Sequence, residues 1–139
     1  MYLLDTNVVS ELRKAPSNRA NKSVLRWADT VSPYSLYLSA VSVLELEIGV
    51  LLMERRDANQ GKLLRVWLDD KVIPAFSDRI LPVDAGIARS CAKLHVPNPR
   101  SERDAMIAAT ALLHDMTIVT RNVVDFKETG VNLLNPWSN

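Results

Sequence analysis

Short apolar runs alternate with longer segments of helical periodicity along most of the chain. The apolar runs predict β-strands at residues 2–4, 37–39, 80–83, 117–120 and 131–134. The periodic segments predict helices at residues 8–13, 20–31, 41–55, 60–72, 85–94 and 102–114. Strands that alternate with helices indicate parallel βαβ units. We therefore expect an α/β fold with a central parallel sheet that is covered by helices on both faces.

The predicted helix at residues 41–55 is apolar nearly all round. Two stripes at helical spacing follow roughly opposite sides, Val41, Leu44, Ile48, Leu51 and Leu52 on one and Val43, Leu46, Val50 and Met53 on the other. Such a helix is buried on both sides. The helix at 60–72 follows without a strand between them, so we expect a helical hairpin. Either this hairpin or a second subunit covers the second stripe.

An aspartate ends the first predicted strand. The apolar residues 2–4 give way at once to Asp5, and the polar residues Thr6 and Asn7 follow. Right-handed crossovers place the C-terminal ends of parallel strands along one edge of the sheet. Ligands of open α/β sheets bind at that edge, so Asp5 is a candidate for chemistry.

Two further acids lie in the first turns of predicted helices. Glu45 is about one turn into the helix that follows the second strand. From its position, an exposed helix acid is as good an interpretation as a functional acid. Asp104 lies in the first turn of the helix at 102–114, three residues after Ser101. That spacing is typical of a capping box, and an acid there suits the helix dipole, so capping is the better interpretation from position alone. Asp84 is explained as a helix N-cap.

Asp5, Glu45 and Asp104 can converge near one sheet edge. Carboxylates that lie close together repel each other and take up protons unless a cation compensates their charge. Mg²⁺ and Mn²⁺ prefer oxygen ligands, and no histidine–cysteine cluster indicates zinc. A carboxylate-held Mg²⁺ with open positions is suited to phosphodiester cleavage.

The length and composition of the chain limit the classes of protein to which it can belong. With 139 residues the chain is long enough for one domain with a real core. A net charge of +1 gives no general basic field, so nucleic acid would be held locally by a few Arg and Lys or by metal ions. No apolar run approaches the roughly 20 residues of a membrane span, and the N-terminus has no signal-peptide shape. The single cysteine, Cys91, can form no internal disulfide, so we expect a cytoplasmic protein.

Five short motifs follow one another in a specific order and spacing, at residues 3–7, 38–46, 104–111, 118–122 and 135–137. Through them the chain resembles, nearly end to end, the PIN-domain ribonucleases. It is most similar to the VapC-type toxins of bacterial toxin–antitoxin pairs, in the FitB-like subgroup. The resemblance implies a three-layer α/β/α sandwich and an endoribonuclease that depends on Mg²⁺ or Mn²⁺. Because of this resemblance, we interpret Glu45 and Asp104 as residues of a functional site, rather than as an exposed helix acid and a capping residue.

The resemblance also implies a role for each motif residue. Asp5, Glu45 and Asp104 are the metal-binding catalytic acids, and Asn7 and Thr120 orient them through hydrogen bonds. Asp5 and Asp104 would hold the principal ion, with Glu45 as a further ligand or as the base through water. Metal-activated water would then attack the phosphorus of RNA.

The chain departs from the family pattern after the fourth strand. Many relatives carry a fourth acid at the position of Asn122, and a neutral amide supplies no charge. Asp125 can substitute if Asn122 begins a short helix, and otherwise it caps that helix or pairs with Arg121. Arg121 is a candidate contact for the substrate phosphate, although a surface salt bridge explains it equally well.

The resemblance implies partners as well: an RNA substrate, a second copy of the chain in a homodimer, and a cognate antitoxin whose C-terminal segment blocks the site. An Arg of that segment would compete with the metal by charge. The principal alternative is a catalytically weak or inert PIN-like module that binds protein or RNA, and Asn122 favours it. Phosphatases of the haloacid-dehalogenase type fit poorly, because they need a second aspartate where this chain has Asn7.

Overall fold

Within residues 1–138, which the computed structural model describes, five short strands form one parallel sheet. Their order across the sheet is β3-β2-β1-β4-β5. The strands are β1 (Tyr2–Leu4), β2 (Leu36–Ser39), β3 (Ile80–Leu81), β4 (Thr117–Val119) and β5 (Asn132–Leu134). The predicted strands are all present, and the central strand β1 is the one that ends in Asp5.

Helices connect the strands as the periodicity predicts. The α-helices are α1 (Thr6–Leu12), α2 (Lys22–Thr30), α3 (Ala40–Arg56), α4 (Ala58–Trp67), α5 (Ile73–Ala75), α6 (Ala85–Leu94) and α7 (Glu102–Leu113). Shorter helical turns are η1 (Ala15–Ser17), η2 (Pro33–Ser35), η3 (Leu68–Val72, a π-helix), η4 (Val123–Phe126) and η5 (Pro136–Ser138). The helix predicted at 60–72 is thus α4 followed by a π-turn. Asp84 caps α6 as predicted, because its Oδ1 accepts a hydrogen bond from the Ile87 amide at 2.9 Å.

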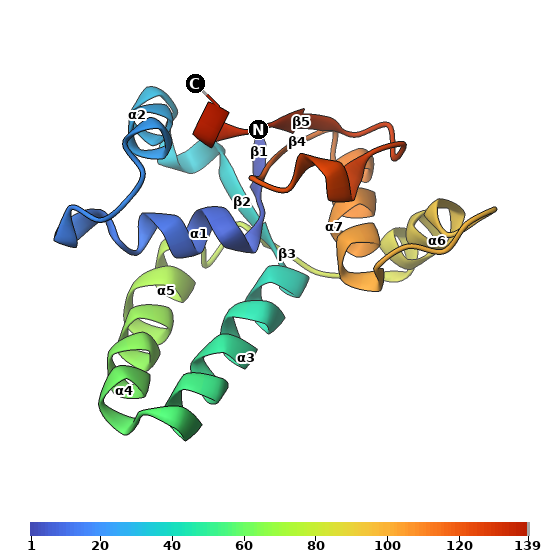
Figure 1. Ribbon diagram of the computed structural model, residues 1–139. Helices are drawn as coiled ribbons and strands as arrows, with labels where there is room; N and C mark the ends of the chain where they lie inside the picture. Colours follow the sequence, from blue (N-terminus) through green and yellow to red (C-terminus); the bar gives the residue numbers. More distant parts are fainter. Residues whose placement is uncertain (139) are drawn as a thin grey trace.

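Consecutive leucines of β1 enter two separate cores. Leu4 packs on one face of the sheet with residues of α1, α2, α3 and η3. Leu3 packs on the other face with residues of α7 and η4, and α6 packs on α7 through a smaller cluster. Figure 1 shows α1, α2 and α4 on one side of the strands and α6 and α7 on the other. The predicted three-layer α/β/α sandwich is confirmed. No helix in residues 1–138 has the length and apolar character needed to cross a membrane.

The predicted hairpin of α3 and α4 covers only one stripe of α3. Leu46 and Val50 of the second stripe are buried against the partly buried Leu64 and Trp67. The first stripe behaves differently, because most of it faces solvent. Its exposed members are Leu44, Leu51 and Leu52, and α4 adds the exposed Leu63 and Val66. Of the two options for covering the second stripe, the structure thus shows the hairpin, and it is the first stripe that stays largely uncovered.

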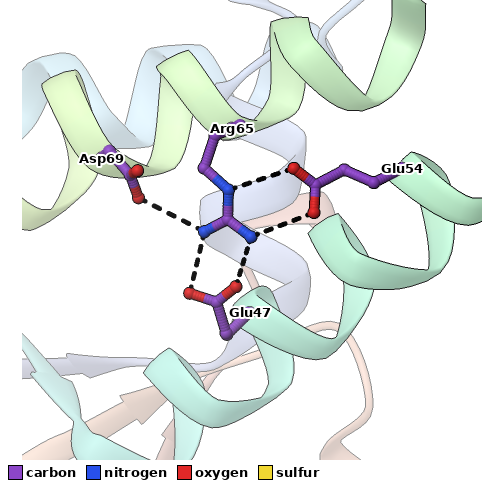
Figure 2. A network of polar contacts seen from close by, with 4 residues as sticks. All are labelled: Glu47, Glu54, Arg65 and Asp69. Carbon is purple, nitrogen blue, oxygen red and sulfur yellow. Dashed lines mark hydrogen bonds and ion pairs between the residues drawn. The ribbon is translucent and has the colours of Figure 1, made fainter. Parts of the chain in front are cut away.

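Arg65 ties the two helices of the hairpin together. Its guanidinium donates to Glu47 at 2.6 and 3.0 Å, to Glu54 at 3.2 and 3.3 Å, and to Asp69 at 3.5 Å (Figure 2). Glycine at position 61 lets the helices approach closely, because a Cβ atom there would collide with the backbone of Glu54. The hairpin thus holds α3, and with it Glu45, in a defined position.

Candidate active site at the C-terminal edge of the sheet

Asp5 lies at the centre of the sheet edge and is only 7% exposed. Its amide continues the strand ladder by donating to the Val119 carbonyl at 2.9 Å. Oδ1 accepts from the Thr6 amide at 2.8 Å, and Oδ2 accepts from the Thr120 hydroxyl at 2.8 Å and from Asn7 Nδ2 at 3.3 Å. The carboxylate is therefore held in one orientation from β1, α1 and the end of β4.

Thr120 and Asn7 are hydrogen-bonded to each other as well as to Asp5. Asn7 Nδ2 donates to the Thr120 hydroxyl at 3.3 Å, and Asn7 Oδ1 accepts from the Arg121 amide at 3.2 Å. The Asn122 amide donates to the Thr120 hydroxyl at 3.0 Å. The structure thus brings both predicted orienting residues onto the carboxylate that they were expected to orient.

Glu45 projects from the second turn of α3 toward the same edge. Ser39 begins this helix at the end of β2, where its hydroxyl accepts from the Val41 amide at 3.0 Å. One oxygen of Glu45, Oε1, accepts from the Thr6 hydroxyl at 2.7 Å, and Oε2 lies 3.8 Å from Arg103 Nη1. Two residues that the sequence analysis did not single out, Thr6 and Arg103, therefore hold Glu45. Each adjoins a predicted acid in the chain, which is the only signal that could have identified it.

Asp104 is half-buried in the first turn of α7. Ser101 begins the helix without a side-chain hydrogen bond to its backbone, so the capping-box geometry is not formed. Burial, followed by the negative charges of Asp125, Asp5 and Glu45, raises the pKa of Asp104 to about 6, although a hydrogen bond with Ser101 opposes the rise.

Burial is also the main cause of the raised pKa of Asp5. Hydrogen bonds from Thr120 and Thr6 oppose this rise, whereas the charges of Glu45 and Asp125 add to it. Because the charges of Glu45 and Asp125 act on both Asp5 and Asp104, and that of Asp5 also acts on Asp104, the four acids lie in one electrostatic environment.

Asp125 joins this group from η4, and Asn122 does begin the short helix that the substitution requires. Among the acids, Asp125 has the largest effect on the pKa of Asp104. It neither caps η4 through its side chain nor, among residues 1–138, forms an ion pair with Arg121. Arg121 instead lies over the Trp137 ring, with its guanidinium carbon 5.4 Å from the centroid. The charge that Asn122 lacks is thus present three residues later.

The donor set suits a hard divalent cation. None of the ion pairs formed by residues 1–138 includes Asp5, Asp104 or Asp125, so these three carboxylates have no side-chain counter-charge there. In the same part of the chain, no three acidic, histidine or cysteine side chains are arranged as a group that could hold a metal ion. Glu45 contacts Thr6 and Arg103 instead.

A family model describing the PIN domain matches residues 2–132, which include the acids, strands β1 to β4 and the connecting helices. The chain belongs to the PIN-domain family. Two proteins are similar to this PIN domain over nearly their whole lengths. "VapC ribonuclease Y4jK" of Sinorhizobium fredii is 39% identical over 99% of this chain and 98% of its own. "Toxin FitB" of Neisseria gonorrhoeae is 39% identical over 99% of both chains.

A solved structure agrees with these sequence relatives. The crystal structure of FitAcB from Neisseria gonorrhoeae superposes on this PIN domain with a TM-score of 0.89. The two chains are 34% identical in that comparison, which covers 100% of each. The similarity to FitB-like PIN domains expected from five short motifs is thereby confirmed.

Proposed function

We propose that this PIN domain is a Mg²⁺- or Mn²⁺-dependent endoribonuclease and the toxin of a type II toxin–antitoxin pair. The observation that carries this proposal is the shared electrostatic environment of Asp5, Glu45, Asp104 and Asp125, in which three of the acids lack a basic partner within residues 1–138. The names of the relatives, VapC ribonuclease and toxin FitB, support the same activity.

The four acids are assigned different roles according to their surroundings. Asp5 and Asp104 are assigned as the principal metal ligands, with Asp125 supplying the charge that Asn122 lacks. Glu45, held by Thr6 at 2.7 Å, acts as a further ligand or as a base through water. When bound, the divalent ion activates water and neutralises charge on the phosphate.

The direct test is cleavage of a defined RNA by the purified chain, freed of any antitoxin. Cleavage with Mg²⁺ or Mn²⁺ and none with EDTA is expected. An intact RNA under both conditions would overturn the proposal. Calorimetric metal titration then separates the main alternative, because an inert binding module shows no divalent-ion binding.

The exposed apolar side chains of the hairpin indicate self-association. Leu52 and Leu63 are 63% and 64% exposed, and a hollow of about 380 Å³ lies beside Leu52. Large exposed apolar patches mark interaction surfaces, so we infer that two copies pair through α3 and α4. Leu52→Glu is expected to shift the elution volume from dimer to monomer at micromolar concentration. A parent chain that already elutes as a monomer would contradict this inference.

The cognate antitoxin is inferred to cover the acids of the same edge, in a heteromeric complex that forms in the cytoplasm. A guanidinium is the chemistry that such a segment would present, since Arg pairs with carboxylates through two parallel hydrogen bonds. Co-expression with the neighbouring gene product should yield a complex that lacks nuclease activity and that EDTA does not dissociate.

A further inference from the structure

A groove leaves the candidate active site along α1 and ends at the α3–α4 hairpin. Its volume is about 170 Å³, and its lining includes Thr6, Ser10, Arg13, Glu45, Leu64 and Trp67. Thr6 and Glu45 are hydrogen-bonded to each other at 2.7 Å and belong to the site already described. The groove is therefore continuous with the acids rather than a separate cavity.

The far end of this groove carries a cation that an aromatic ring holds in place. The guanidinium carbon of Arg13 lies 5.8 Å from the centroid of the Trp67 ring. Arg13 is exposed, and none of the ion pairs within residues 1–138 includes it. A stacked guanidinium loses less conformational freedom on binding, and its planar set of donors matches the oxygens of a phosphate.

Between the two ends the groove is apolar and bears one hydroxyl. The buried Leu46 and Val50 line it with the half-buried Leu64, and Ser10 supplies the hydroxyl. Such a surface suits the flat face of a nucleobase, which single-stranded RNA offers without cost in base pairing.

We propose that this groove binds the RNA nucleotide next to the cleaved bond, with Arg13 donating to a phosphate and the base lying against Leu64 and Trp67. The proposal rests on the proposed ribonuclease function. Arg13 follows α1, which spans about 10 Å at the usual helical rise, so it reaches a neighbouring phosphate and not the one being cleaved. Arg13 binds substrate, and Trp67 positions Arg13.

Binding can be measured separately from cleavage. The fluorescence anisotropy of a labelled single-stranded RNA in EDTA reports the dissociation constant without turnover. Arg13→Ala is expected to weaken binding about tenfold, the typical loss for a charge-assisted hydrogen bond. The dependence of log K on log salt should fall by about 0.7, as expected when one phosphate contact is lost from a single strand.

The matched control is Lys14→Ala, which removes the same charge from the next residue. Lys14 is paired with Glu11 at 3.2 Å and does not line the groove. It should change the dissociation constant less than about twofold, as is usual for an exposed pair. Equal losses of RNA affinity in both variants would overturn the proposal, since Arg13 would then contribute only a general positive charge.

Steady-state kinetics with Mg²⁺ give a second readout. Arg13→Ala should raise KM about tenfold and leave kcat nearly unchanged, because the contact is made equally in the bound substrate and the transition state. Arg13→Lys keeps the charge but loses the planar stack, so an intermediate KM is expected. Trp67→Leu should behave like Arg13→Lys, and a KM equal to that of the parent in all three variants would overturn the proposal.

The possible failures are distinguishable. If the parent binds RNA through Arg13 but cleaves none in either metal, the ribonuclease function fails while the groove assignment stands. If the parent cleaves and Arg13→Ala does so with an unchanged KM, the groove assignment fails alone. If Arg13→Ala loses antitoxin binding and keeps RNA binding, the groove belongs to a protein segment and the proposal is wrong.

Discussion

The molecule contains two clusters of acids, and they are compensated in opposite ways. On the hairpin, Glu47, Glu54 and Asp69 surround the guanidinium of Arg65. At the sheet edge, the charge of Asp5 acts on Asp104, and neither acid forms an ion pair with a basic side chain within residues 1–138. The first cluster is built around a cation of the chain itself. In the second, only Glu45 has one, Arg103 at 3.8 Å, and Asp5 and Asp104 have none within residues 1–138.

Protonation reflects this difference. Hydrogen bonds and charge from Arg65 lower the pKa of Glu47, although burial opposes the change. Burial and neighbouring carboxylates raise the pKa of Asp5 and of Asp104. The carboxylates of the hairpin therefore stabilise the folded state, whereas those at the sheet edge destabilise it. Carboxylates with raised pKa values are typical of a functional site.

The strongest way to test the comparison is to neutralise one acid in each cluster. Asp5→Asn is expected to reduce RNA cleavage below detection, because the variant loses the charge of the most buried donor while keeping its shape. Glu47→Gln should cleave at the parental rate, since its carboxylate serves the hairpin. Both are measured with the same labelled RNA and Mg²⁺, and comparable rates for Asp5→Asn and the parent would exclude the assigned site.

A smaller effect is expected from Thr6, which links the sheet edge to α3. Thr6→Val removes the hydroxyl that donates to Glu45 at 2.7 Å and leaves the shape nearly unchanged. Loss of such an orienting hydrogen bond typically costs about 10–100-fold in metal affinity or activity.

Thr6→Ser restores the donor and should recover most of the loss, as measured by Mn²⁺ titration calorimetry and by kcat. A Thr6→Val variant with parental values in both measurements would show that the hydrogen bond does not position Glu45.

The smallest expected effect is on stability, and its sign differs between the clusters. Folding raises the pKa of Asp104 from 3.8 to about 6, so the folded state binds more protons than the unfolded state between these values. The free energy of unfolding of the metal-free protein therefore falls as pH rises through this interval. Asp104→Asn removes this loss of stability, because the asparagine does not ionise. The melting temperature of the variant should therefore exceed that of the parent by a few degrees at pH 7.

Glu47 contributes in the other direction. Its pKa is lowered on folding, so it adds stability above its ordinary pKa of 4.5 that is lost as pH falls through the lower folded value. Glu47→Gln should therefore melt below the parent at pH 7, with the gap closing in acid. Thermal denaturation in EDTA at pH 7 and pH 4 compares both variants, and shifts of the same sign at pH 7 would contradict the distinction between the clusters.

Local sequence pattern was sufficient for the sheet and for the position of Asp5 at the end of its central strand. A strand end is marked where an apolar run stops, as before Asp5, and parallel topology then brings distant strand ends together. Position alone could not decide whether Glu45 and Asp104 have a functional or a structural role. An acid near the start of a helix has the same local sequence pattern in an active site and on an exposed surface. Only the order of several motifs together distinguished the two.

Features that depend on contacts between distant turns could not be predicted. The outward orientation of Leu44, Leu51 and Leu52 follows from where α4 packs, and both stripes of α3 are equally apolar. The Arg65 cluster joins residues up to 18 positions apart, with no local pattern to mark it. Thr6 was missed because its role depends on Glu45, 39 positions away.

The short strand β1 has a consequence for how the molecule opens. It is hydrogen-bonded to strands on both sides, and the Asp5 amide donates to Val119 at 2.9 Å at its very end. Amides in central strands exchange their hydrogens only when the whole domain unfolds, whereas exposed helices fray in partial openings. The amide of Asp5 should thus be among the slowest to exchange, and those at the tip of the hairpin among the fastest. The acid at the centre of the site is mounted on the most persistent part of the fold, and the hairpin that holds Glu45 belongs to a part that opens earlier.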